Sequence, residues 1–305
     1  MHTTTTTTTT TATRAVRLLT ALALSAVTAA AVTGCGGEHH TGPSKVRPDR
    51  PATRPEDRAR QVADAWDGSA AAATWGKGYY PMADAVRLPD GGLHGAADRH
   101  AYETGTFELR GTLPAAPRPG GVVRWQNGGS LGMPILSARE VYTSLVRDSG
   151  PGPRLTVTGA RPGETTVVTS RGRATVPAWL FTVRGYDTPL RIAAVSPSPL
   201  PRTPVRPLGP EPTDEQAPLG EVVDVAPDGR SVTVRATHGS CDDGPVVKTL
   251  ETAHSVVLSA SVAGARDGIC PSNLLIERVR VTLKSPVGGR ALLDAFTGRP
   301  LTHGQ

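Results

Sequence analysis

Aromatic residues make up only 4% of this 305-residue sequence, and lysine occurs just four times. So few aromatic side chains argue against a surface that binds nucleic acid by stacking on its bases. The signature motifs of common enzymes are missing too: the P-loop, the Rossmann glycine motif, the HExxH zinc motif, the EF-hand loop and the SxxK serine motif. The sequence therefore names no reaction and no cofactor, and it predicts no nucleic-acid partner.

Only one long apolar run is present. Residues 18–32 are apolar apart from three hydroxyl residues, and Arg14 and Arg17 precede them. This length suits the apolar region of a signal peptide, whereas a membrane-spanning helix needs about 20 residues. The run ends in Val32-Thr33-Gly34-Cys35, which resembles the bacterial lipobox. The alternative is an ordinary signal peptide with an accidental cysteine.

The lipobox resemblance implies a fate for Cys35. Cleavage before this residue would remove residues 1–34, and the cysteine sulfur would carry a diacylglyceryl group, with palmitate-type chains making the anchor firm. The resemblance thus implies a lipoprotein held on the extracytoplasmic face of the cell membrane, with the lipid bilayer as its partner through this N-terminal anchor.

Two more cysteines complete the count of three. Cys241 and Cys270 would be the only thiols left after lipidation, and an even pair in an exported chain predicts a disulfide. This bridge would enclose 28 residues. In the chain-entropy model, a loop of that size stabilises the fold by about 3.5 kcal/mol.

Metal binding is the alternative use of this region. His238 lies three residues before Cys241, and Asp242 and Asp243 follow, which leaves a zinc or calcium site conceivable. No second pair of ligands accompanies them, so a simple turn is the preferred interpretation and no metal ligand is predicted. His94 and His100 lie six residues apart without a metal-ligand period, and we expect them on the surface.

Composition divides the chain into five parts. Residues 45–60 carry a net charge of +3, which could lie near anionic phospholipid or wall polymer or could simply be solvated. Eight prolines occur among the 23 residues of 196–218 and predict a semi-rigid linker. The predicted parts are a signal peptide (1–34), a flexible Pro/Arg-rich tether (35–52), an α+β, β-rich domain (53–195), the Pro-rich linker (196–218) and a small all-β domain (219–305).

Two capping boxes predict short helices in the first domain. Thr53 with Glu56 opens one, and Ser137 with Glu140 opens the other. Short β-branched runs separated by Gly and Pro predict strands for most of the rest, with a break at Pro162-Gly163 and a sheet edge or bulge at Pro177. The expected strands are 104–113, 121–125, 155–160, 165–170, 175–183 and 190–195.

The sequence of the second domain predicts strands almost throughout. "EVVDVA", Pro227-Asp228-Gly229 and "SVTVRA" predict a hairpin. Residues 255–264 and 275–283 alternate apolar with polar or small side chains, as half-buried strands do, and 290–296 adds another run. We predict a mainly β fold with a few short helices, in which the second domain is an antiparallel sandwich or open barrel.

Several phrases resemble a recurrent actinobacterial secreted lipoprotein type. They are "TVPAWLFTVRGYDTPLRIAAV" at 175–195, "GSCDDGPVV", "VVLSASVAG" and "LLDAFTGRPL". Together with the lipobox they touch most of the mature chain. The resemblance implies a cell-envelope lipoprotein and implies nothing about a reaction.

One short stretch of the sequence matches a catalytic motif. Gly128-Gly129-Ser130-Leu131-Gly132 fits the G-x-S-x-G pattern of a nucleophile elbow, which needs a strand before the serine and a helix directly after it. Met133-Pro134 follows instead, so a flexible turn is the preferred interpretation. Asp187, His238 and His254 keep the chain order of a triad without further support.

Four aromatic residues could line a groove but more simply pack in a core: Trp66, Trp75, Tyr79 and Tyr80. The precursor charge of +6 becomes +4 without the two signal-peptide arginines. This favours weak attraction to anionic envelope polymers. We predict a non-catalytic module that binds a ligand, cell-wall polymer or envelope protein; the alternative is a secreted hydrolase.

Overall fold

The computed structural model describes residues 54–114, 120–148, 150–213, 215–264, 270–271 and 273–304. The protein is mainly β, with 39% strand and 15% helix, which confirms the predicted fold class. The signal peptide, the tether and Cys35 lie outside the described residues. Within the described ranges, every helix is too short or too polar to cross a membrane.

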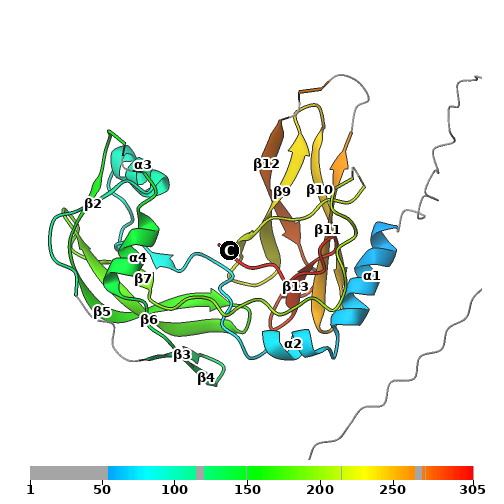
Figure 1. Ribbon diagram of the computed structural model, residues 1–305, viewed down its shortest axis with the longest axis horizontal. Helices are drawn as coiled ribbons and strands as arrows, with labels where there is room; N and C mark the ends of the chain where they lie inside the picture. Colours follow the sequence, from blue (N-terminus) through cyan, green and yellow to red (C-terminus); the bar gives the residue numbers. More distant parts are fainter. Residues whose placement is uncertain are drawn as a thin grey trace, which may run out of the picture. The chain divides into compact units, whose positions relative to one another are not determined.

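The first sheet holds seven strands, with β1, β7, β6, β3 and β4 in spatial order and β5 on β6 (Figure 1). The predicted strands at 104–113 and 121–125 belong to this sheet, where β2 pairs with β5 in parallel and β3 pairs with β6. Its strands are β1 (Val86–Arg87), β2 (Phe107–Leu109), β3 (Gly121–Trp125), β4 (Ser130–Met133), β5 (Leu155–Thr169), β6 (Gly172–Val183) and β7 (Leu190–Ala193).

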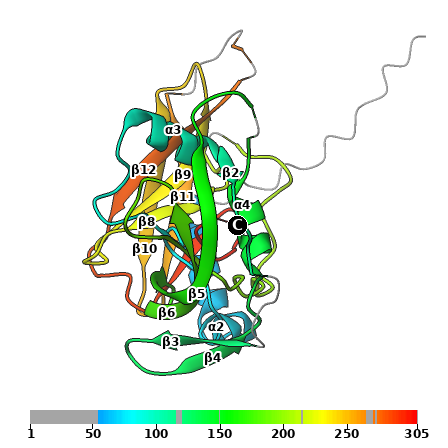
Figure 2. The ribbon, with the colours of Figure 1, turned by 90° about the vertical axis from the view of Figure 1, so that its left-hand side faces the viewer.

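β5 runs without a break, so the expected division at Pro162-Gly163 is wrong (Figure 2). Pro162 is tolerated because β2 leaves the ladder after Val157, and among the described strands only β6 then pairs with β5. Gly163 suits this position because a Cβ there would overlap the side chain of Leu180, which would have to move. The two residues that suggested a turn therefore fit one long strand.

Pro177 lies inside β6 at the point where the neighbouring strand changes. β3 pairs with β6 up to Thr175, and β7 pairs from Ala178 onward. The proline thus falls in a gap between two ladders, where a missing N–H costs no strand-to-strand hydrogen bond. The sequence predicted an edge or a bulge at Pro177. The gap is equivalent, because here too the residue needs no N–H for a strand-to-strand hydrogen bond.

The C-terminal part contains two three-stranded sheets. One has the order β10-β11-β13 and the other β12-β9-β8. The predicted hairpin is present as β8 and β9, but β13 pairs with β11 in parallel, so this part is not purely antiparallel. The strands are β8 (Val222–Val225), β9 (Ser231–Gly239), β10 (Gly244–Glu251), β11 (Ser255–Ala263), β12 (Leu274–Thr282) and β13 (Ala291–Asp294).

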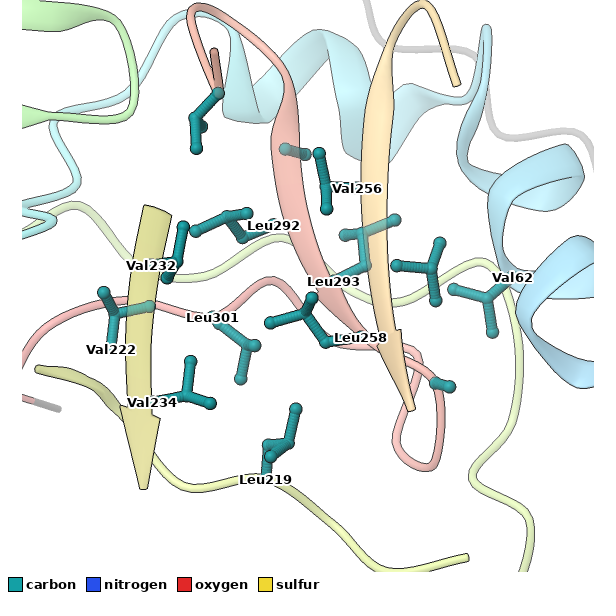
Figure 3. Packing of buried hydrophobic residues seen from close by; sticks show 14 of the residues in the cluster. Val62, Leu219, Val222, Val232, Val234, Val256, Leu258, Leu292, Leu293 and Leu301 are labelled. Carbon is teal, nitrogen blue, oxygen red and sulfur yellow. The ribbon is translucent and has the colours of Figure 1, made fainter. Parts of the chain in front are cut away.

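A hydrophobic core lies between these sheets and helix α1 (Pro55–Trp66). Val62 of α1 belongs to the same buried cluster as Leu258 and Leu293 (Figure 3). The buried guanidinium of Arg58 adds polar contacts, because its Nε donates to the carbonyl oxygen of Ala295 at 2.8 Å. The helix expected at the start of the first domain therefore packs on the C-terminal strands.

The remaining helices are α2 (Ala70–Trp75), α3 (Ala96–Thr104) and α4 (Ala138–Leu145). The capping box at Ser137 and Glu140 is confirmed, with both reciprocal hydrogen bonds in place. Thr53 lies outside the described residues, and α1 instead has Arg54 at its N-cap without a side-chain cap. Pro55 at the first helical position explains this start, because its missing N–H would have no helical partner.

The proline-rich segment 196–218 packs against its surroundings. Pro199 accepts a hydrogen bond from the Tyr80 hydroxyl at 3.1 Å, and the carbonyl of Arg206 accepts one from Arg58 at 2.7 Å. Leu200 and Val205 pack on the core of the C-terminal sheets. Residues 51–305 form one compact unit, within which the proposed two-domain division stays a prediction.

Candidate functional site

A cavity of about 480 Å³ is the candidate site. Its volume lies in the range of small-molecule pockets, about 300–1,000 Å³. Five chain segments line it: residues 79–86, 102–107, 144–147, 192–197 and 303–304. The polar side chains at the site are Tyr79, Asp84, Tyr102, Ser144, Arg147 and His303; the apolar ones include Val86, Phe107, Leu145, Ile192 and Val195.

Backbone hydrogen bonds hold the segment that leads into the cavity. The N–H of Met82 donates to the Val168 carbonyl at 2.9 Å, and the N–H of His303 donates to the Pro81 carbonyl at 3.0 Å. Farther along, Val86 of β1 pairs with Ile192 of β7. The lining is therefore fixed by pairing between segments that are distant in the sequence.

Asp84 and Tyr102 form a polar pair at the cavity. The Tyr102 hydroxyl donates to Asp84 Oδ2 at 3.3 Å, while Asp84 Oδ1 accepts the N–H of Val86 at 3.0 Å. Burial, followed by the charge and the hydrogen bond of Asp84, raises the pKa of Tyr102, and Arg147 opposes this rise. The tyrosine stays a neutral donor at physiological pH.

Arg147 caps the end of α3. Its Nη2 donates to the carbonyls of Tyr102 at 3.3 Å and Glu103 at 3.0 Å, an arrangement that suits the negative end of a helix. Gly105 has a φ of +71°, and a Cβ there would lie 2.8 Å from Arg147 Nε, so glycine is required. Nε and Nη1 make no hydrogen bond within the described part of the chain, and they stay available to an acceptor in the cavity.

His303 lies in the lining of the cavity. Its Nδ1 lies 2.9 Å from the carbonyl oxygen of Val222. A carbonyl only accepts, so Nδ1 donates its proton to this oxygen. The cavity lining therefore combines an imidazole ring with the Arg147 donors.

Tyr79 is the most deeply buried polar residue of the lining. Its side chain is fully buried, and its hydroxyl makes no hydrogen bond to any described residue. Burial raises the pKa of this hydroxyl. A buried, unsatisfied hydroxyl costs free energy, so a polar ligand atom within reach would be favoured.

The cavity also contains the three residue types of a catalytic triad: Ser144, His303 and Asp84. They make no triad in this structure, because the Ser144 hydroxyl donates to the Val141 carbonyl at 2.8 Å. His303 Nδ1 faces a backbone carbonyl instead of a carboxylate. The hydrogen bonds that activate a nucleophile and orient its base are therefore not made.

Ser130, the serine of the G-x-S-x-G pattern, begins β4. It pairs with Arg124 of β3 across a hairpin turn, and a strand instead of a helix follows it (Figure 2). A nucleophile elbow requires a strand before the serine and a helix directly after it. Ser130 is also not part of the cavity lining.

Cys241 and Cys270 form a disulfide with their α-carbons 6.1 Å apart, which confirms this prediction. A zinc site using Cys241 is thereby excluded, and the described residues contain no cluster of three potential metal ligands. His238 is buried, with its Nε2 3.2 Å from Glu277 Oε1. Asp242 accepts the N–H of Gly239 at 2.6 Å in the expected turn.

The other residues considered in the sequence are either packed in a core or exposed on the surface. Trp66, Trp75, Tyr79 and Tyr80 are all buried, as core packing predicted, and Trp75 stacks on Tyr80 with ring centroids 4.1 Å apart. His94 and His100 are exposed, as expected. No motif or spacing in the sequence connects Asp84, Tyr102, Arg147 and His303, so none of them was a predicted site residue.

Comparison with models of known families, with curated proteins and with solved structures finds no match to this chain. The function must therefore follow from the residues of the fold and the cavity themselves.

Proposed function

We propose that this protein is a cell-envelope lipoprotein whose folded part binds a small amphipathic ligand without chemically changing it. The observation that carries the proposal is the cavity at Tyr79, Tyr102 and Arg147, whose volume of about 480 Å³ suits a small molecule. Apolar side chains can receive the body of the ligand, while exposed polar side chains can bind a charged or hydrogen-bonding end.

The lipobox resemblance at Cys35 supports the envelope location. The disulfide between Cys241 and Cys270 is consistent with it, since such bonds persist mainly in oxidising compartments. A ligand-binding module tethered to the outer face of a membrane would meet small molecules of the cell envelope. A hydrolase is the less supported alternative, because Ser144, His303 and Asp84 do not hydrogen-bond to one another.

Blocking the cavity tests the binding function. Anilinonaphthalene sulfonate is a suitable probe, because it combines an apolar ring system with an anionic group and fluoresces when bound. Ser144→Phe would place a ring at the exposed edge of the cavity, and we expect at least about tenfold weaker probe binding. Thr143→Phe is the matched control, because Thr143 is its exposed neighbour on α4 and does not line the cavity.

Equal probe binding by the native chain and Ser144→Phe would contradict the proposed site. A separate measurement tests the anchor: Cys35→Ser should leave the protein unlipidated and release it from the membrane fraction. If that variant is processed and fractionates with membranes as the native protein does, the lipobox interpretation is wrong.

A further inference from the structure

The start of β12 exposes three consecutive apolar side chains. Leu274 is 69% exposed, Leu275 41% and Ile276 60%. β12 is an edge strand, and among the described strands it pairs with β9 alone. Contiguous exposed apolar side chains, unlike single scattered ones, are a mark of interaction surfaces. We call these three residues the β12 tip.

Arginines follow the β12 tip on the outer face of the strand. Val279 and Val281 face the core, so the alternating Leu274, Ile276, Arg278 and Arg280 face away from it. Arg278 makes no ion pair to any described residue, and Arg280 Nε donates to Ser231 Oγ at 3.2 Å. The face therefore passes from apolar side chains to cations along a single strand.

Two acidic residues near the β12 tip, Glu277 and Asp242, do not lie on its outer face. Glu277 projects on the opposite face of β12, where its Oε1 lies 3.2 Å from His238 Nε2. Asp242 is in the β9–β10 turn, and its carboxylate is engaged by the N–H of Gly239. Arg235, which is opposite Arg278 on β9, is already paired with Glu221 at 2.9 Å. Arg278 and Arg280 are thus the cations of this face that remain open to an anion.

The disulfide holds the tip in place. Cys241 lies in the turn between β9 and β10, and Cys270 comes shortly before Leu274. Leu274 in turn pairs with Gly239 at the end of β9. The apolar tip is therefore fixed in position.

The chain enters the folded unit beside the second half of β10. The first turn of α1, at Pro55 and Glu56, lies beside Lys248 and Thr249 of β10 (Figure 1). β10 begins at Gly244, four residues before Lys248 or about 14 Å along the strand. The start of β10 adjoins the β9–β10 turn and the disulfide, at the end of the sheets where the β12 tip lies.

We propose that the β12 tip inserts into the interface of a phospholipid bilayer, with Arg278 and Arg280 binding lipid phosphate groups. Leu274, Leu275 and Ile276 would enter the boundary between head groups and acyl chains, as the apolar side chains of peripheral membrane proteins do. The cations would then lie at the level of the phosphates and add attraction to anionic lipids. This contact would orient the folded unit on the membrane, in addition to any N-terminal lipid.

Vesicle binding by unlipidated protein tests the proposal. The chain from Gly36 onward retains the complete compact unit and removes the lipid anchor. We expect it to sediment with vesicles of phosphatidylcholine mixed with phosphatidylglycerol. Replacing Leu274 and Ile276 together by Ser should weaken binding at least about tenfold. Val122→Ser, at a 42% exposed valine of β3, should bind as the native chain does.

The position of the charge is tested with two double variants that have the same net charge as each other. Arg278→Gln with Arg280→Gln should lower the affinity for these vesicles by about 30-fold, from about two cation–lipid contacts. Arg99→Gln with Arg139→Gln, two exposed arginines on α3 and α4, changes the net charge equally and should have a much smaller effect. Equal losses in the two double variants would overturn the assignment of the binding face.

Fluorescence quenching measures whether the β12 tip enters the bilayer. Tryptophan placed at Leu274 should be quenched by brominated lipid, whereas tryptophan at Val122 should not. The proposal is overturned if the native chain does not bind vesicles or if the Leu274 and Ile276 double variant binds unchanged. It is equally overturned if the tip instead supports self-association, which would appear as a native dimer that the double variant loses.

Discussion

Tyr79 and Ser198 are 119 residues apart and hold each other by two hydrogen bonds. The N–H of Tyr79 donates to Ser198 Oγ at 3.0 Å, and the N–H of Ser198 donates to the Tyr79 carbonyl at 2.8 Å. Val195 and Pro197 line the cavity just before this point. The proline-rich segment therefore helps to build the candidate site.

Removing the Ser198 hydroxyl should destabilise this junction. Ser198→Ala leaves the N–H of Tyr79 without its acceptor, and we expect a loss of about 1 kcal/mol in the free energy of unfolding. Urea denaturation measures the loss, with Ser196→Ala, at an exposed serine of the same segment, as the control. Equal stability of the two variants would mean that the hydrogen bond adds nothing.

Tyr79→Phe should have the opposite effect. The Tyr79 hydroxyl is buried without a hydrogen-bond partner among the described residues, so its removal should stabilise the ligand-free protein by about 1 kcal/mol. Tyr80→Phe is the matched comparison and should destabilise, because the Tyr80 hydroxyl donates to the Pro199 carbonyl. A loss of stability in Tyr79→Phe would show that the hydroxyl has a partner.

The same hydroxyl makes stability depend on alkaline pH. Burial raises the pKa of Tyr79 above its ordinary value of 10.0, so the folded state holds this proton more tightly than the unfolded chain does. The resulting stability is complete below pH 10.0 and falls as the pH rises above it. Tyr79→Phe should remove this part of the alkaline loss, as unfolding measured on both sides of that pH would show.

Glu251 should make stability depend on acidic pH. Burial tends to raise the pKa of its carboxyl, but hydrogen bonds from the Lys284 N–H, from Arg290 and from the Ser285 N–H outweigh burial and lower it. A lowered pKa contributes stability above the ordinary value of 4.5, and this stability is lost as the pH falls through the lowered value.

Glu251→Gln should therefore cost about 3 kcal/mol at neutral pH, because Arg290, with only 12% of its side chain exposed, loses its charged partner. The difference from the native protein should shrink in acid. Glu211→Gln, at an exposed position, should change little. A neutral-pH loss that stays constant into acid would show that the charge of Glu251 is not the cause.

The disulfide should stabilise the strands around it. Replacing Cys241 and Cys270 together by Ser should lower the free energy of unfolding by about 3.5 kcal/mol, which the chain-entropy model gives for a loop of this size. Thiol titration of the unfolded, unreduced chain from Gly36 onward should find no free thiol. Two free thiols would contradict the bond in the exported protein.

Local signals predicted local structure well. The capping box at Ser137 and the hairpin through Pro227-Asp228-Gly229 depend on neighbouring residues, and both are present. The division of β5 at Pro162-Gly163 failed because a strand with one partner tolerates a proline that a central strand would not. Which strands lie beside a residue is not a local property.

The sequence by itself determined the mainly β class, the burial of the four aromatic residues and the pairing of Cys241 with Cys270. Each follows from composition, periodicity or the number of thiols available. Only the tertiary structure decided that α1 packs on the C-terminal sheets and that five separate segments enclose one cavity. Asp84, Arg147 and His303 share no motif, because their proximity results from hydrogen bonds and packing between distant parts of the chain.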